Sequence, residues 1–182
     1  MPRVLVPLAQ GCEELEAVTI IDLLRRAQIT VVTASLDEKP VLASRGVVLI
    51  ADCRLDQVMD EEFDMIVLPG GGAGTENLNH DPRIHTLLKK LHAAGKYTAA
   101  ICAAPKVLAT AGLLENKQAT SYPTVLTEMQ LPTLRFIDAP IVRDDKVITS
   151  RGPGTAMDFS LSLIEILVGK AVRDKVEAEL VR

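Results

Sequence analysis

The chain has 182 residues, 48% of them hydrophobic and 24% charged, so it can bury a core as one domain, residues 1–182. Its net charge of −4 and its 3% of aromatic residues argue against nucleic acid as a partner, because basic surface and stacking rings are both scarce. No apolar run is long enough to span a membrane. Three cysteines without a C-x-x-C pair predict free thiols, and hence a cytoplasmic protein.

Short aliphatic runs alternate along the chain with segments of helical periodicity. Strands are expected over residues 4–8, 29–34, 65–68 and 97–101, a hairpin or an edge strand over 41–50, and a hairpin over 141–149. Helices are expected over 13–26, 55–59, 82–94, 103–111, 155–168 and 170–181, and short strands and loops over 118–122, 125–129 and 135–137. This alternation predicts an α/β layer sandwich with a mostly parallel central sheet.

Three informative segments directly follow expected strands: the loop at Gly11, the glycine-rich residues 69–74, and Cys102. The carboxyl ends of parallel strands lie at one edge of a sheet, where open α/β sheets bind ligands. We therefore expect these segments to meet in one site.

Cys102 stands between an expected strand and an expected helix, in the sequence Ala-Ala-Ile-Cys-Ala-Ala-Pro. Small neighbours allow a sharp turn that resembles a nucleophile elbow, and a helix N-terminus is expected to lower the pKa of the thiol. The alternative is a small buried core residue, as free cysteines commonly are.

Glu16 is the carboxyl group that we expect to reach Cys102 from the first helix. The apolar residues Leu15, Val18, Ile21 and Leu24 recur there at helical spacing, which predicts the buried face. Glu16 lies close to that face, whereas Glu13 and Glu14 are expected in solvent. Buried and protonated, Glu16 would donate a hydrogen bond to a thiolate; the alternative is an acidic first turn that serves the helix dipole.

The backbone amides of Gly71 and Ala103 are the expected oxyanion donors. Arg151 precedes the last pair of helices and would bind either a substrate carboxylate or a neighbouring acid. Cys12 is expected to flank the site as a second thiol. No metal site is expected, because the three histidines, His80, His85 and His92, lack ligand spacing and are interpreted as surface residues. The spacing of the glycines also fits no nucleotide-binding fingerprint.

Four motifs in order resemble the ThiJ/PfpI family, in the branch of the Parkinson-associated deglycase and bacterial YajL. They are residues 8–16, 67–71, 99–105 and 149–155, and the resemblance covers essentially the whole chain. It implies a flavodoxin-like three-layer sandwich, a homodimer and no cofactor. It also implies an oxidation-prone Cys102 hydrogen-bonded by protonated Glu16, with Gly71 and Ala103 as oxyanion donors, Gly70 beside the site, and Arg45 and Arg151 near the site and the dimer interface.

Tyr122 stands where some members of this family carry a histidine beside the cysteine. A neutral tyrosine is a poor base near pH 7, so turnover is expected to be modest. No histidine follows Cys102 in the chain, which disfavours both the peptidase and the glutamine amidotransferase activities of the superfamily.

Two functions remain open. The first is an enzyme of the deglycase or glyoxalase type, acting on a small dicarbonyl such as methylglyoxal or on glycated protein side chains. The second is an oxidative-stress sensor or redox-regulated chaperone that oxidises Cys102 without turnover. Neither involves a membrane.

Overall fold

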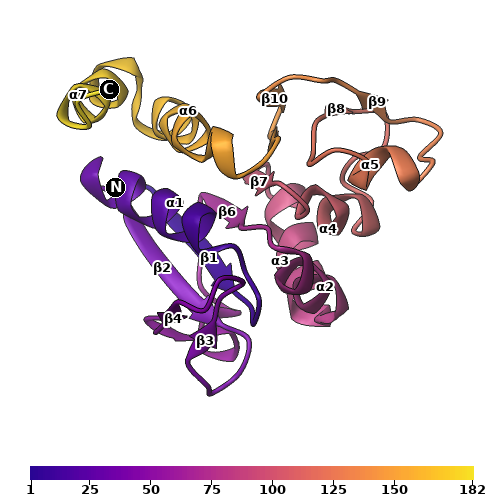
Figure 1. The fold of residues 1–182 in the computed structure, drawn as a ribbon, viewed down its shortest axis with the longest axis horizontal. Helices are drawn as coiled ribbons and strands as arrows, with labels where there is room; N and C mark the ends of the chain where they lie inside the picture. Colours follow the sequence, from indigo (N-terminus) through magenta and orange to yellow (C-terminus); the bar gives the residue numbers. More distant parts are fainter.

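A seven-stranded sheet runs through the centre of the computed structural model, which describes residues 1–182 (Figure 1). Its strand order is β10-β11-β7-β6-β1-β2-β5, and every neighbouring pair is parallel except the hairpin β10–β11. The strands are β1 (Arg3–Leu8), β2 (Thr30–Ser35), β5 (Cys53–Arg54), β6 (Met65–Leu68), β7 (Tyr97–Ile101), β10 (Ile141–Asp144) and β11 (Val147–Ser150).

Helices cover both faces of this sheet (Figure 1). One face packs against α1 (Glu14–Arg26), α6 (Ala156–Val168) and α7 (Lys170–Glu179), and the other against α2 (Gly72–His80), α3 (Pro82–Ala93) and α4 (Pro105–Thr110). Alternate strand residues enter opposite cores: Val4 and Val6 lie in one cluster and Leu5 in the other. The predicted α/β sandwich with a mostly parallel sheet is confirmed. None of its helices combines the length and the apolar character needed to cross a bilayer.

The smaller elements lie beyond the sheet edges. They are the antiparallel hairpin β3 (Val41–Leu42) and β4 (Val48–Leu49), the parallel pair β8 (Gln118–Ala119) and β9 (Arg135–Phe136), the helix α5 (Val125–Glu128), and the 3-10 turns η1 (Leu55–Val58) and η2 (Pro153–Thr155).

Three expected boundaries are wrong. The glycine-rich loop ends at Gly71, and the next residues already form α2. This helix was not predicted because it contains two glycines. The helix after Cys102 begins only at Pro105, because the elbow occupies the intervening residues. Residues 125–128 form a helical turn where short strands and loops were expected.

The buried face of α1 also differs from the prediction. Leu15 and Val18 are 52% and 46% exposed. The residues that face the sheet include Ala17, Ile20 and Leu24, which satisfy the same helical spacing. The helix carries two rows of apolar residues with similar spacing, and the row that packs on the sheet lies beside the fully buried Glu16. Of the predicted stripe, Leu24 is buried and Ile21 is half-buried, so periodicity misplaced only Leu15 and Val18.

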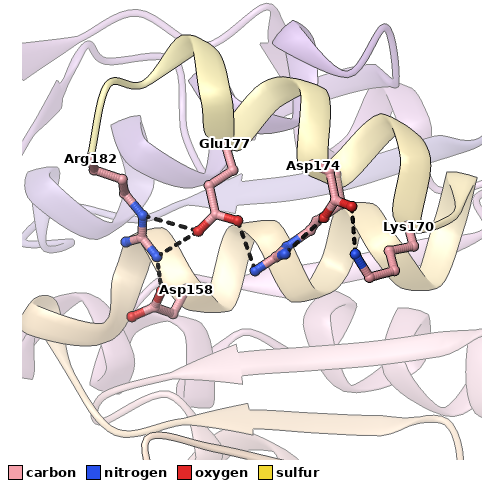
Figure 2. Close-up of polar contacts among 6 residues, drawn as sticks. Asp158, Lys170, Asp174, Glu177 and Arg182 are labelled. Atoms are coloured by element: carbon pink, nitrogen blue, oxygen red, sulfur yellow. Dashed lines mark hydrogen bonds and ion pairs between the residues drawn. The ribbon is translucent and has the colours of Figure 1, made fainter.

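Ion pairs attach α7 and the C-terminal residue to each other and to α6 (Figure 2). Glu177 contacts Arg173 at 3.0 Å and Arg182 at 3.1 Å, and Arg182 also pairs with Asp158 of α6. Only Val176 of α7 is fully buried. The last helix thus packs through Val176 and the partly buried Val172, and its ion pairs lie at the surface.

Candidate active site

Cys102 occupies a sharp turn at the end of β7. Its φ of +64° lies in the left-handed region, which residues with side chains adopt at a cost. Two backbone hydrogen bonds hold this conformation: the Cys102 amide donates to the Ser150 carbonyl at 3.0 Å, and its carbonyl accepts from the Tyr122 amide at 2.8 Å. The elbow predicted from the small neighbouring residues is present, and it leaves Cys102 8% exposed.

Glu16 extends from the first turn of α1 and is 0% exposed. Its Oε2 accepts the Gly70 amide at 2.8 Å, whereas its Oε1 has no hydrogen-bond partner. Burial raises the pKa of Glu16 to about 7, although the hydrogen bonds with Gly70 and the Cys102 thiol oppose that rise. Oε2 is the oxygen on the side of Cys102, since it and the Cys102 Cβ would each lie 2.7 Å from a Cβ on Gly70.

The pKa of the Cys102 thiol is raised to about 12 by burial and by the charge and hydrogen bond of Glu16. The expected lowering of this pKa is therefore wrong for the resting site. The helix that was to stabilise a thiolate begins only at Pro105 and is short. Backbone hydrogen bonds from Gly71 and Ala103 to the sulfur lower the pKa, but they do not offset burial.

The loop between β6 and α2 lies so close to the elbow and to the start of α1 that Gly70 and Gly71 have no room for a side chain. A Cβ on Gly70 would lie 2.7 Å from both the Cys102 Cβ and the Glu16 Oε2. Gly71 has a φ of +88°, and a Cβ there would lie 2.7 Å from the Glu13 amide nitrogen. These contacts hold the loop against the elbow, where the amides of Gly71 and Ala103 lower the pKa of the thiol. The structure thus brings together five predicted residues: Cys102, Glu16, Gly70, Gly71 and Ala103.

Glu14, which was expected in solvent, is instead 9% exposed. Its Oε1 accepts the amide of Arg45 at 2.8 Å, and its Oε2 accepts the Ser44 hydroxyl at 2.9 Å. Glu14 thereby fixes the loop of the β3–β4 hairpin to α1. The Arg45 side chain is exposed and forms no ion pair.

Cys12 lies behind the glycine loop. It is 1% exposed, and a Cβ on Gly74 would approach its Cα to 2.6 Å. Burial and the nearby Glu14 carboxylate raise the pKa of its thiol to about 11. These surroundings are those of a packed, protonated thiol.

Tyr122 and Arg151 lie at the exposed rim. Tyr122 is 50% exposed, and its ring would be 3.4 Å from a Cβ on Gly152. Arg151 pairs with Asp138, so the neighbouring acid, not a free substrate site, occupies its guanidinium in this structure. His80 and His92 are exposed, and His85 is half-buried, with Nε2 2.8 Å from the Asn79 carbonyl oxygen.

Ser150 is a site residue that sequence reasoning missed. Its carbonyl fixes the Cys102 amide, and its hydroxyl bonds to the Pro140 carbonyl at 2.9 Å and lies 2.7 Å from the Thr155 hydroxyl. A backbone carbonyl leaves no signature in a sequence. The available signals are its place at the end of an expected hairpin strand and within the motif of residues 149–155.

Residues 2–166 match the model of the DJ-1/PfpI family. The chain belongs to this family. It is 42% identical to "Protein dj-1beta" of Drosophila melanogaster over 91% of this chain and 89% of that protein. It is 36% identical to "Glutathione-independent glyoxalase DJR-1.2" of Caenorhabditis elegans, over 88% of this chain and 85% of that protein.

Plant relatives and solved structures agree with this assignment. "Protein DJ-1 homolog A" of Arabidopsis thaliana is 41% identical over 97% of this chain, but this chain spans only 46% of the plant protein's length. The crystal structure of Drosophila DJ-1beta superposes with a TM-score of 0.94 at 40% identity, covering 99% of this chain and 97% of that one. Oxidized Toxoplasma gondii DJ-1 gives a TM-score of 0.94 at 40% identity, covering 100% and 98%. These relatives support the DJ-1 branch of the family.

Proposed function

We propose that this protein is a cofactor-free cysteine enzyme of the glyoxalase or deglycase type, which converts methylglyoxal or its early adducts to lactate. The observation that carries the proposal is the buried Glu16 carboxyl beside Cys102: Glu16 Oε2 and the Cys102 Cβ would each lie 2.7 Å from a Cβ on Gly70, and the charge of Glu16 raises the pKa of the thiol. The glyoxalase named among its relatives supports this reaction class.

In the first step, Cys102 Sγ attacks the aldehyde carbon while the thiol proton passes to Glu16. A C–S bond forms, and the carbonyl oxygen becomes an alkoxide that the Gly71 and Ala103 amides stabilise. Glu16 returns the thiol proton to the alkoxide. Its carboxylate then moves a proton from the former aldehyde carbon to the neighbouring carbon, while the hydroxyl proton passes to the neighbouring carbonyl oxygen. The hemithioacetal thus becomes a lactoyl thioester without an external oxidant, and water hydrolyses it to lactate and free thiol.

Glu16 replaces histidine as the base in this scheme. A proton acceptor is most effective when its pKa lies near the working pH, and burial raises the pKa of Glu16 to about 7. Tyr122 is exposed at the rim and is not required for proton transfer. The Cys102 thiol is then mostly protonated at rest, so turnover should be modest.

The test is lactate formation from methylglyoxal by freshly reduced protein. Cys102→Ser should lower the rate by at least about 100-fold, because an alcohol is a far weaker nucleophile than a thiol here. Cys53→Ser is the matched control and should retain the activity. Lactate formation that is equal in wild type and Cys102→Ser would overturn the proposal.

The second candidate is a redox sensor, favoured by the same two amides because they would stabilise a sulfinate on Cys102. The raised thiol pKa argues that peroxide reacts slowly, since the thiolate is the reactive form. Peroxide titration followed by intact mass separates the two roles. Rapid stepwise oxygen addition at Cys102, without lactate formation, would favour the sensor.

We also propose that two copies pair through α1 and the β3–β4 hairpin. Leu15 and Val18 of α1 and Val47 and Val48 of the hairpin are each 46–59% exposed, and Glu14 hydrogen-bonds the hairpin to the helix beside them. Apolar side chains gathered on adjoining elements suit a self-complementary interface. Leu15→Glu should convert a dimer to a monomer in light scattering coupled to size-exclusion chromatography; a wild-type monomer would contradict this pairing.

A further inference from the structure

A cavity of about 470 Å³ lies at the end of the sheet opposite Cys102. Tyr97, the first residue of β7, forms part of its wall, and the same strand ends directly before Cys102. A strand rises about 3.3 Å per residue, so the cavity lies roughly 16 Å from the elbow along β7. It is therefore separate from the candidate active site, and what it binds does not depend on the proposed function.

Lys146 brings an unpaired positive charge to this cavity. Four lysines of the chain are half-buried, and the other three, Lys96, Lys106 and Lys117, all form ion pairs. The Lys146 ammonium forms neither an ion pair nor a hydrogen bond, and it lies 4.0 Å from the centre of the Tyr97 ring. The ring holds the ammonium beside the cavity, so an anion would meet a cation that is already in place.

Asp64 is the carboxylate that lines the cavity, and both of its oxygens have partners. Its Oδ1 pairs with Lys96 at 2.8 Å, and its Oδ2 accepts the amide of Arg3 at 3.0 Å. Asp64 therefore neutralises Lys96 and leaves Lys146 without a counterion. The side chains that line the cavity carry a net charge of +1.

Arg143 places a second unpaired cation near the same ring. Its guanidinium is exposed, forms no ion pair and lies 5.9 Å from the centre of the Tyr97 ring. Asp145, in the turn between Arg143 and Lys146, forms an ion pair with neither. An anion in the cavity would reduce the repulsion between the two cations.

Much of the remaining wall is apolar. Ile166 and Leu167, in the last turn of α6, line the cavity and are half-buried, and Met1 and Pro2 add further apolar atoms. Gly95 leaves space in the wall, because nothing lies within 4 Å of the Cβ that it lacks. A cavity of this volume, charged in one part and apolar in another, suits a small organic anion.

We propose that this cavity binds a monocarboxylate with an apolar chain. The carboxylate would pair with Lys146, and the chain would lie on Ile166 and Leu167. A single negative charge matches the net charge of the lining side chains. The same chemistry occurs in a short fatty acid and at the C-terminus of a peptide that ends in an apolar residue.

The test compares three small probes on the full chain by backbone amide NMR. Hexanoate carries both the charge and the chain, hexanamide lacks the charge, and acetate lacks the chain. We expect saturating shifts at residues 95–97, 146–147 and 166–168. Hexanoate should bind about threefold tighter than hexanamide, the range of a partly exposed ion pair. It should bind about tenfold tighter than acetate, because four more carbons contact the apolar wall.

Lys146→Gln should abolish the preference for hexanoate over hexanamide. Lys89→Gln is the matched control, since it removes an exposed lysine of α3 that forms no ion pair, and it should keep the preference. Leu167→Ala should weaken binding of hexanoate more than binding of acetate. Tighter binding of N-acetylglycylleucine than of hexanoate would assign the carboxylate to a peptide C-terminus, and the reverse order to a free acid.

Two results would overturn the proposal: equal affinity for hexanoate and hexanamide, or shifts that do not saturate at these residues. Lys146 would then only complement the partial negative charge at the C-terminal ends of α3 and α6.

Discussion

The site and the C-terminal helix use carboxylates in opposite ways. Glu16 is alone in a dry interior with one oxygen unpartnered, and its pKa is raised. Glu177 and Asp174 on α7 lie at the surface among arginine and lysine side chains (Figure 2). Many charge pairs in water contribute little to stability, whereas one buried carboxyl changes both stability and reactivity. The number of ion pairs in a region therefore does not indicate where a reactive site lies.

Glu16→Gln is the sharpest test of this contrast. The folded protein keeps the Glu16 proton up to a pKa of about 7, whereas the unfolded chain loses it near 4.5. The wild-type free energy of unfolding should therefore fall as pH rises through this window, by about 3 kcal/mol in total. Glutamine has no proton to lose, so the variant should be more stable than wild type at pH 8 by about that amount, yet inactive.

Urea denaturation at pH 5 and pH 8 measures this effect. Glu14→Gln is the matched control in the same helix turn. Burial opposes ionisation of Glu14, but hydrogen bonds, including those from Ser44 and Arg45, outweigh it and hold its pKa below the ordinary value. Its contribution is therefore present at neutral pH and lost in acid, so Glu14→Gln should destabilise at pH 8. The same sign in both variants would contradict the assignment.

Gly70→Ala should produce the next largest effect. The added methyl group would lie 2.7 Å from Cys102 Cβ and from Glu16 Oε2, and overpacking of this kind costs about 2 kcal/mol. Gly72→Ala is the control, since nothing lies within 4 Å of its Cβ and its φ is not positive. Thermal unfolding should therefore separate the two variants; equal melting temperatures would show that the loop does not approach the elbow as closely as described.

Glu177→Gln on α7 should have the smallest effect. It removes contacts to Arg173 and Arg182, which are partly exposed and together contribute about 0.5 kcal/mol. Salt screens such pairs, so the difference should vanish at 1 M sodium chloride. A loss above about 2 kcal/mol, or one that persists in high salt, would show that α7 depends on its charges far more than other surface helices do.

Most of the fold follows from the sequence because aliphatic strand runs and helical periodicity are local signals. The helix α2 was missed because Gly72 and Gly74 are poor helix formers that the tertiary contacts tolerate. The face of α1 was misjudged because two stripes had the same period, and only the packed sheet chooses between them. For the same reason, Glu14 was expected in solvent but is held by the hairpin loop.

The site was partly visible in the sequence. Cys102, Glu16 and the glycine loop follow strand ends, and the parallel sheet brings strand ends together. The direction of the Cys102 pKa was not predictable, because it depends on how deeply the thiol is buried and on its distance from Glu16.

Under the proposed mechanism, the positive φ of Cys102 sets stability against activity at a single position. Glycine adopts this backbone conformation freely, so Cys102→Gly would relieve strain of about 1 kcal/mol while removing the reactive sulfur. A search for thermostable variants that ignored activity would be drawn to this substitution. Any such engineering of the protein must therefore hold residue 102 fixed.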